Sequence, residues 1–245
     1  MYAPSFDVIL AVKDSAKYLE GFFDSYVKQT YNRKRLIVID GGSQDGSTDI
    51  IDQYREIIDV YQCCQDSSIY TAWNRALRQS SGEWLVFLGA DDRFVSMDTF
   101  DIVARDIHAS KTNINLITYL AQQGPRVVGG LIEKESFDCG GSLKVCHAGA
   151  FHRATLFKHS QFDETYKIVG DYDFLLRKLV EIRQHHSNLV LFDIGSTGIS
   201  TALSALYLRE GWFLYCRYAK FQSLSAVLWI ARQFLRLLKA QIRSH

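Results

Sequence analysis

The chain has 245 residues, of which 47% are apolar and 22% charged, so it can bury a core and is not a disordered polymer. A formal charge of +1 argues against a protein that coats nucleic acid, and five cysteines without a C-x-x-C pair argue against a disulfide scaffold or structural zinc site. The near-neutral total hides a basic end, because residues 209–245 hold seven Lys or Arg and one acid, a net of +6, which leaves −5 for residues 1–208.

The first 90 residues alternate between short apolar runs, typical of buried strands, and stretches with apolar residues at helical spacing. The expected strands cover residues 6–12, 36–39, 60–64 and 84–88, and the expected helices cover residues 15–30, 50–58 and 69–79. Strands and helices that alternate in this way predict an α/β fold with a Rossmann-like, mostly parallel sheet flanked by helices.

The second half of the chain is less regular. Helices are expected over residues 99–109 and 172–182, and strands over residues 115–121, 127–132 and 189–192. No internal repeat or low-complexity segment interrupts it.

The end of the chain has the pattern of an amphipathic helix. Apolar residues recur at helical spacing from Leu224 to Leu238, while Arg232, Arg236 and Lys239 share another face. A basic amphipathic helix can lie in a membrane interface, whereas a helix docked on the domain with a solvated basic face is the alternative. We therefore expect a cytoplasmic protein, with peripheral contact at the inner face of a membrane through residues 224–245 as an open interpretation.

Charged residues follow three of the predicted strands at their carboxyl ends. Lys13 and Asp14 follow the first strand, Asp40 ends the second, and Asp91 and Asp92 follow the fourth. Ligands of parallel α/β sheets bind beyond these ends. A rim of carboxylates can hold a phosphorylated ligand through a divalent cation, and oxygen ligands suit Mg²⁺ or Mn²⁺. Each aspartate alone could cap a turn or a helix, but their joint placement indicates a nucleotide site.

Four segments, in this order, resemble the family 2 glycosyltransferases, which are inverting enzymes of GT-A fold. They read VILAVKDSAKYLEGFFDSYVKQTY, LIVIDGGSQDGSTDII, DSSIYTAWNRALRQSSGEWLVFLGADD and GDYDFLLR, and the match runs from about Asp7 to Arg177. The resemblance implies a GT-A domain over residues 1–208, with a nucleotide-binding half over about 1–95 and an acceptor half over 96–208. The basic helical tail over residues 209–245 then follows.

The resemblance also assigns roles to single residues. Asp171 matches the general base, and Asp91 matches the last carboxylate of the D-x-D motif that contacts the metal; Asp91 and its neighbour Asp92 are the expected metal-binding residues. The first position of that motif is Gly89 here. His147 is a candidate contact to the acceptor or the diphosphate, with a structural histidine as the alternative. The expected nucleotide contacts are Ala11, Lys13, Asp14, Asp40, Gly41, Asp66, Asn74 and Asp91.

The proposed base also has a simpler interpretation. An inverting transfer needs one carboxylate that accepts the proton of the acceptor hydroxyl, and Asp171 fits that role. Asp171 could also be the N-cap of the helix over residues 172–182, and both roles are compatible. Asp173 stands two residues later and is not expected to share a helix face with Asp171, so one of the two is expected to face the site while the other caps or is solvated.

The leading hypothesis is an inverting glycosyltransferase that moves a sugar from a nucleotide-sugar, expected to be a UDP-sugar, to a hydroxyl of a glycan or lipid-linked acceptor. Its expected context is cell-surface polysaccharide synthesis, with no nucleic acid partner. The alternative is a catalytically weak nucleotide-binding or scaffold subunit, which Gly89 leaves open. A nucleotidyltransferase is a third hypothesis, but it needs a Gly-rich loop with a basic residue, for which Lys13 alone is a poor substitute.

Overall fold

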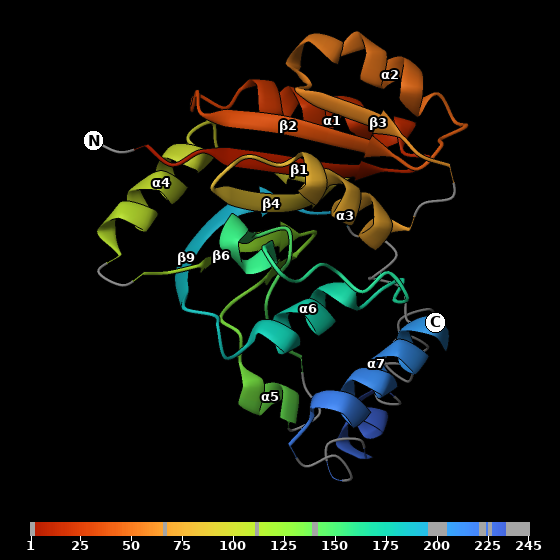
Figure 1. Ribbon diagram of the computed structural model, residues 1–245, viewed down its shortest axis with the longest axis vertical. Helices are drawn as coiled ribbons and strands as arrows, with labels where there is room; N and C mark the ends of the chain where they lie inside the picture. The colour runs from red at the N-terminus through yellow and green to blue at the C-terminus, as the bar shows by residue number, and fades with distance from the viewer. Residues whose placement is uncertain are drawn as a thin grey trace.

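A curled sheet flanked by helices forms the centre of the molecule (Figure 1). The structure is a computed structural model that describes residues 3–65, 68–110, 113–138, 142–195, 205–220, 224 and 227–233. Within these residues the sheet has nine strands in the order β3-β2-β1-β4-β8-β6-β9-β5, and β7 pairs with β6. The predicted α/β fold is confirmed.

The first half of the chain supplies the parallel part of the sheet. Its strands are β1 (Phe6–Val12), β2 (Lys34–Asp40), β3 (Val60–Cys63) and β4 (Trp84–Gly89), and its helices are α1 (Ala16–Val27), α2 (Ser47–Gln53) and α3 (Ile69–Gln79). Strand β1 pairs in parallel with both β2 and β4, and β2 pairs in parallel with β3. The single helix expected over residues 50–58 is divided into α2 and a short 3₁₀ helix, η1 (Arg55–Ile57).

The second half adds a mixed part of the sheet. Its elements are β5 (Arg93–Phe94), α4 (Thr99–Ala109), β6 (Leu116–Gln123), β7 (Arg126–Val128), α5 (Lys134–Asp138), β8 (Ala150–Arg153), η2 (Ala154–Phe157), α6 (Gly170–Lys178), β9 (Gln184–Asp193) and α7 (Ala205–Tyr218). Strand β8 lies antiparallel between β4 and β6, and it was not predicted. The strand expected over residues 127–132 is only the three residues of β7, and β9 is longer than the strand expected over residues 189–192.

Each face of the sheet has its own core. Val8 and Leu10 of β1 belong to a buried cluster with residues of α1, α2 and α4, whereas Ile9 belongs to a cluster with residues of α3, α6 and α7. Successive side chains of a strand point to opposite faces, and here both faces are covered. Burial on both sides explains why these strands are continuous apolar runs rather than alternating ones.

Helix α7 belongs to the body of the molecule and crosses the boundary predicted at residue 208. Leu214 and Tyr215 are buried in the same cluster as α3 and α6, and Trp229 packs against Tyr215 with ring centroids 5.5 Å apart. Of the amphipathic helix expected toward the end, residues 224 and 227–233 are helical, and residues 234–245 lie outside the described residues. Among the described residues, no helix is both long and apolar enough to cross a membrane.

Candidate active site

The register of the parallel strands brings the predicted strand-end residues to one edge of the sheet. Val12 at the end of β1 is paired with Asp40 of β2, and Ala11 is paired with Gly89 of β4. Since β2 and β4 flank β1, their ends are about two strand spacings, roughly 10 Å, apart. The two predicted acidic positions, Asp40 and the turn at Asp91, therefore lie on the same edge.

Asp40 is a fully buried carboxylate enclosed by its own loop. It accepts hydrogen bonds from the backbone N–H groups of Gly42 and Ser43 at 3.2 Å, from the Ser43 hydroxyl at 2.5 Å and from the Cys63 thiol at 3.3 Å. A carboxylate has about four lone-pair sites, so these donors occupy it. The thiol is the weakest of them and belongs to an exposed residue, so it is the contact that a ligand N–H can most easily replace.

The loops after β1 and β2 are joined by hydrogen bonds. Lys13 donates from Nζ to the carbonyl oxygen of Gly41 at 2.7 Å, and the Asp14 N–H donates to the Ser43 hydroxyl at 2.9 Å. Asp14 has a φ of 46°, a left-handed conformation that is uncommon outside glycine. Its carboxylate in turn accepts from the N–H of Gln44 at 2.8 Å. These residues thus form one rigid rim at the ends of β1 and β2.

The turn after β4 directs its two aspartates differently. Asp92 is buried and accepts a hydrogen bond from the N–H of Gly89 at 2.7 Å, and burial, with the charge of Asp91 adding, raises its pKa to about 7. Asp91 is half-buried beneath the chain that leaves β9. A side chain at Gly195 would lie 1.5 Å from an Asp91 carboxylate oxygen, so only glycine permits this approach.

The turn after β4 suits a cation that is bound jointly by the protein and a ligand, rather than a cation bound by protein side chains alone. Within the described part of the chain, no group of three or more His, Cys, Asp or Glu side chains could hold a metal ion. Asp92 accepts a hydrogen bond from the backbone of its own turn, so the Asp91 carboxylate is the group on this turn that is better placed to hold a cation. Mg²⁺ is commonly bound by one or two carboxylates together with substrate phosphates and waters, and Asp91 suits that arrangement.

Asp171 lies in the first turn of α6, close to a tyrosine of α3. The hydroxyl of Tyr70 lies 2.7 Å from the carbonyl oxygen of Ile168 and 3.2 Å from Oδ1 of Asp171. Burial raises the pKa of Asp171 to about 6, although the Tyr172 N–H and the Tyr70 hydroxyl oppose the shift. The N-cap position of α6 is Val169, so the N-cap interpretation of Asp171 is wrong. A carboxylate with this pKa can accept a proton near neutral pH.

The thiol of Cys146 is affected by a carboxylate of the turn after β4 and by one at the start of α6. Burial raises the pKa of its thiol to about 11, and the charges of Asp92 and Asp171 both act in the same direction. One thiol is therefore within electrostatic reach of both carboxylates. The structure thus brings Asp171 into the same region as the Asp91–Asp92 turn, although 79 positions of the sequence separate residues 92 and 171.

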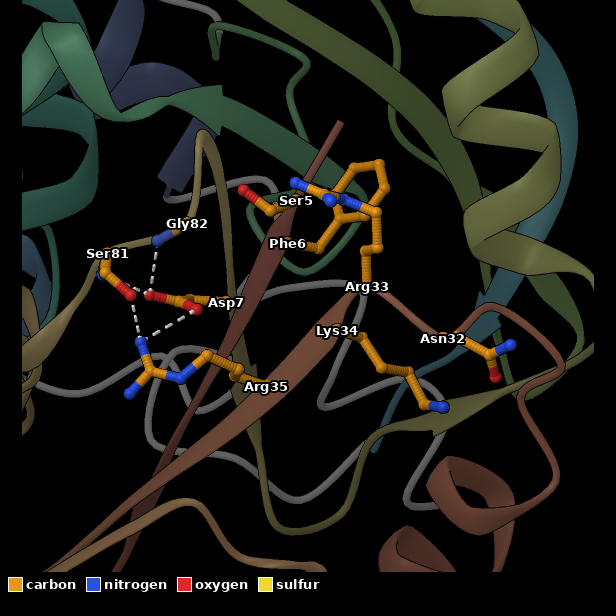
Figure 2. Close-up of a pocket in the computed structure, with 9 residues that line it drawn as sticks. All are labelled: Ser5, Phe6, Asp7, Asn32, Arg33, Lys34, Arg35, Ser81 and Gly82. Carbon is orange, nitrogen blue, oxygen red and sulfur yellow. Dashed lines mark hydrogen bonds and ion pairs between the residues drawn. The ribbon is translucent and has the colours of Figure 1, made fainter. Parts of the chain in front are cut away.

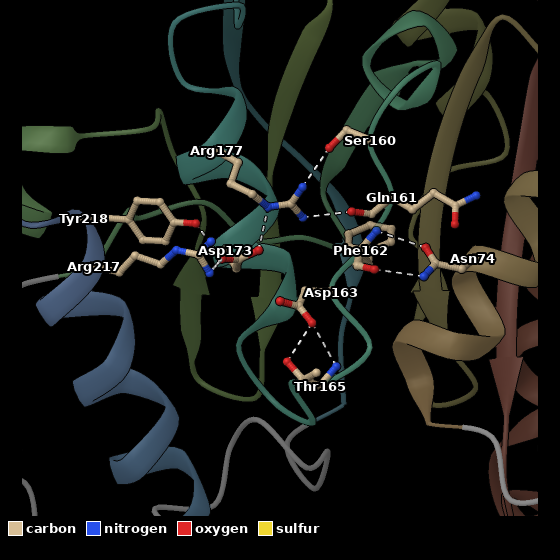
Figure 3. Close-up of polar contacts among 10 residues, drawn as sticks. All are labelled: Asn74, Ser160, Gln161, Phe162, Asp163, Thr165, Asp173, Arg177, Arg217 and Tyr218. Atoms are coloured by element: carbon tan, nitrogen blue, oxygen red, sulfur yellow. Dashed lines mark hydrogen bonds and ion pairs between the residues drawn. The ribbon is translucent and has the colours of Figure 1, made fainter.

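Asn74 has a structural role. Its amide nitrogen donates to the Phe162 carbonyl at 2.9 Å, and its oxygen accepts from the Phe162 N–H at 3.0 Å (Figure 3). The nitrogen also donates to Glu164 at 2.9 Å. Both ends of the amide therefore hold the segment that precedes α6. Contact of Asn74 with a nucleotide stays a prediction, and Asp66 lies outside the described residues.

Asp173 is fully buried, so it is neither solvated nor the N-cap of α6. Its carboxylate receives Arg177 Nε and the Tyr218 hydroxyl, each at 2.7 Å, and Arg217 lies at 3.7 Å (Figure 3). These contacts join α6 to α7. The sequence could not indicate them, because Tyr218 lies 45 residues away.

His147 is packed among aromatic rings. It stacks on Trp73 with centroids 4.8 Å apart and lies 5.0 Å from the ring of His152. Neither of its ring nitrogens has a hydrogen-bond partner among the described residues. Burial, with His152 adding, lowers the pKa of His147 well below its ordinary value, so the ring is neutral at pH 7. Its contact with an acceptor or diphosphate stays a prediction.

A small hollow of about 220 Å³ lies at the opposite edge of the sheet, where β1 and β2 begin (Figure 2). Arg33, Lys34 and Arg35 line it, and buried Asp7 accepts from the N–H groups of Ser81 and Gly82 at 2.7 and 2.9 Å. In Figure 2, Arg35 reaches Asp7 and Ser81. The hollow is thus separated by the length of the strands from the edge that carries Asp40 and Asp91.

The sequence also matches known proteins. Residues 7–132 match the family model described as glycosyl transferase family 2. A PGL/p-HBAD biosynthesis glycosyltransferase of Mycobacterium bovis is 28% identical over 193 residues, which are 72% of this chain and 70% of that protein. TuaG of Bacillus subtilis, named for teichuronic acid biosynthesis, is 30% identical over 96 residues, 38% of each chain.

Solved structures share the fold at low sequence identity. S. aureus TarS 1–349, in complex with UDP-GlcNAc, superposes with a TM-score of 0.69 at 16% identity, over 92% of this chain and 70% of that one. The mannosyltransferase PcManGT of Pyrobaculum calidifontis, in complex with GDP-Man and Mn²⁺, gives 0.68 at 14% identity, over 100% of this chain and 77% of that one.

Proposed function

The chain belongs to glycosyl transferase family 2, and from this premise we propose an inverting transfer of a sugar from a nucleotide-sugar to a hydroxyl group. The protein is a glycosyltransferase of GT-A fold with relatives in glycan and polysaccharide biosynthesis. The proposed donor is a UDP-sugar, and the proposed acceptor is a glycan or a lipid-linked saccharide. The proposed context is the synthesis of cell-surface polysaccharide.

The observation that carries this proposal is the environment of Asp171. Its carboxylate has a pKa of about 6, lies in the region of the Asp91–Asp92 turn, and contacts the hydroxyl of Tyr70. As general base it would take the proton of the acceptor hydroxyl while that oxygen attacks the anomeric carbon. Asp91 would hold a Mg²⁺ or Mn²⁺ ion, which would supply charge neutralisation for the leaving diphosphate.

Donor binding is tested most directly at Asp40. Asp40→Asn should weaken UDP binding in the presence of Mn²⁺ by about 10-fold or more, since a hydrogen bond to a charged group contributes about 1.5–3 kcal/mol. Cys63→Ala is the matched control, because it removes a donor to the same carboxylate and should leave the affinity equal or higher. Calorimetric titration with UDP, and with GDP for comparison, measures both.

The outcomes of that experiment separate the hypotheses. Equal UDP affinity in Asp40→Asn and the unmodified protein would contradict the nucleotide role of Asp40. A chelator should abolish turnover, and Asp91→Asn should reduce it in Mn²⁺. Tight donor binding without hydrolysis or transfer, with Mn²⁺ present, would favour the nucleotide-binding scaffold instead.

We also propose that the C-terminal helices contact an anionic membrane. Trp212 and Phe213 of α7 and Val227 and Ile230 of the following helix are between 37% and 63% exposed. Residues 209–245 carry a net charge of +6. Exposed apolar side chains beside basic residues are the pattern of a helix in a membrane interface.

Vesicle binding tests the membrane contact. The pair Trp212→Ser and Phe213→Ser should lower co-sedimentation with vesicles rich in phosphatidylglycerol, and added salt should lower it for the unmodified protein too. Val180→Ser removes a fully exposed apolar residue elsewhere and should change nothing. The membrane proposal fails when the unmodified protein does not sediment with these vesicles, or when the pair does so equally well.

A further inference from the structure

Glu210 of α7 is a buried carboxylate, 3% exposed, whose described partners are backbone N–H groups. Its Oε1 accepts from the N–H of Lys167 at 2.9 Å, and its Oε2 accepts from those of Ile168 at 2.9 Å and Val169 at 3.2 Å. These three residues directly precede α6, which begins at Gly170. The carboxylate therefore holds the peptide segment from which the proposed base projects.

The same segment connects Glu210 to Asp171 through Tyr70. Ile168 gives its N–H to Glu210, and its carbonyl oxygen accepts from the Tyr70 hydroxyl at 2.7 Å. That hydroxyl also lies 3.2 Å from Oδ1 of Asp171. A rotation of the Ile168 peptide would therefore move the carbonyl oxygen that accepts from the Tyr70 hydroxyl. The contact of that hydroxyl with Asp171 would change as a result.

Close packing and a second attachment between α6 and α7 leave the segment little freedom. A side chain at Gly170 would lie 2.8 Å from the ring of Tyr70, so the start of α6 lies directly against that ring. Asp173, two residues after the base, accepts from Tyr218 at the end of α7 (Figure 3). Helix α7 is thus attached to α6 both before and after Asp171.

Charge suits Glu210 to this task. A carboxylate is acceptor-only and can receive three N–H groups, whereas a glutamine amide offers one oxygen and turns two donors toward the same N–H groups. Negative charge is also favourable at the beginning of a helix, where the N–H groups have no partners within the helix. An amide would therefore leave buried N–H groups unsatisfied, and the segment would shift to find other partners.

We propose that Glu210 is a positioning residue for the catalytic step: it fixes the peptides of residues 167–169 so that Tyr70 and Asp171 keep their geometry. The inference rests on the proposed role of Asp171 as general base. It makes α7 part of the catalytic apparatus, although no atom of Glu210 contacts the donor or the acceptor in this account.

Glu210→Gln tests the proposal with the full chain, by kinetics with a UDP-sugar that the unmodified protein transfers. We expect kcat to fall about 10- to 100-fold, since small misplacements of a reacting group can cost this much. The KM for the donor and the affinity for UDP should stay within about threefold of those of the unmodified protein, because the nucleotide edge is built by β1, β2 and β4 and not by α7. The acid limb of the pH profile of kcat should shift, and Glu210→Asp should recover part of the lost activity.

Two further variants complete the test. Glu135→Gln makes the same exchange at an exposed glutamate of α5 and should leave kcat and the profile unchanged. Tyr70→Phe removes the other end of the connection by deleting a single hydroxyl group and adds no new polar atom, so it should shift the acid limb in soluble protein even where Glu210→Gln yields too little folded chain. Circular dichroism at the assay temperature confirms that each variant is folded.

The inference is overturned when folded Glu210→Gln keeps the unmodified kcat and acid limb, or when its loss of activity is matched by loss of UDP binding. When too little Glu210→Gln folds for an assay, an unchanged acid limb of the kcat profile in Tyr70→Phe overturns the inference. Asp171→Asn, assayed in parallel, separates this from the parent proposal. If Asp171→Asn retains turnover, the base is misassigned, whereas an inactive Asp171→Asn beside a normal Glu210→Gln rejects only the role of Glu210.

Discussion

Asp171→Asn is expected to lower kcat by about 100-fold or more, because an asparagine amide cannot accept the proton of the acceptor hydroxyl. UDP binding should remain, since the carboxylate lies at the start of α6 and not on the rim formed by the loops after β1 and β2. Steady-state turnover beside calorimetric titration with UDP measures both quantities. Asp101→Asn, in the first turn of α4, is the matched control and should keep full activity.

The pH dependence of kcat is an independent test of Asp171 as the general base. The base must be deprotonated to act, so kcat should rise with pH through about 6, the pKa to which burial raises Asp171. A folded-state pKa above the unfolded one means that ionising Asp171 opposes folding as pH rises past about 4. At pH 7, the free energy of unfolding of Asp171→Asn should therefore exceed that of the unmodified protein by about 1–3 kcal/mol. An active or strongly destabilised variant would contradict the assignment.

The second large effect is a loss of stability in mild acid. His152 is fully buried, and neither ring nitrogen has a hydrogen-bond partner among the described residues. Burial lowers its pKa to about 4, although the backbone of Ala150 and Leu85 opposes the shift. The unfolded chain takes up a proton near pH 6.5, which the folded chain does not until about pH 4. Stability is therefore lost as pH falls, by about 2 kcal/mol between pH 7 and 5 from this group alone.

His152→Leu should remove this part of the loss. The quantity to compare is the change in the free energy of unfolding between pH 7 and 5, measured by urea denaturation, because the packing cost of the substitution cancels within each protein. The shifted pKa of His147 acts in the same direction, so some acid sensitivity remains. His159→Gln, at an exposed position, should keep the full loss. An equal loss in His152→Leu and the unmodified protein would show that His152 is not its source.

The parallel half of the fold could be predicted because its strands are buried on both faces. Continuous apolar runs such as residues 8–12 and 84–88 exist for that reason, and the order of the strands then brings Asp40 and Asp91 to one edge. Strand β8 was missed because Ala150–Arg153 is only four residues long and contains His152 and Arg153. Its position between β4 and β6 is set by pairing with those two strands. Four residues are too few to show the alternating pattern of a strand in the sequence.

The polar residues that hold the site depend on partners far along the chain. Asn74 bonds the backbone 88 residues away, and Glu210 bonds residues about 42 positions before it. Each stands as a polar residue in a buried position and interrupts the apolar pattern of its helix, so the pattern gives no indication of its role. Tyr70 and Cys146 were missed for a different reason, because a tyrosine or thiol among other core residues has no distinctive spacing.

Side chains of helix α7 face two different surroundings. Trp212 and Phe213 are exposed to solvent, whereas Glu210 accepts hydrogen bonds from the segment before Asp171. If engagement of the outward side favours one arrangement of that segment, thermodynamic linkage requires reciprocity: a substrate that selects the same arrangement must strengthen the engagement by an equal factor. Attachment to a surface and occupancy of the sugar-transfer centre would then regulate each other through a single helix, without a separate regulatory domain.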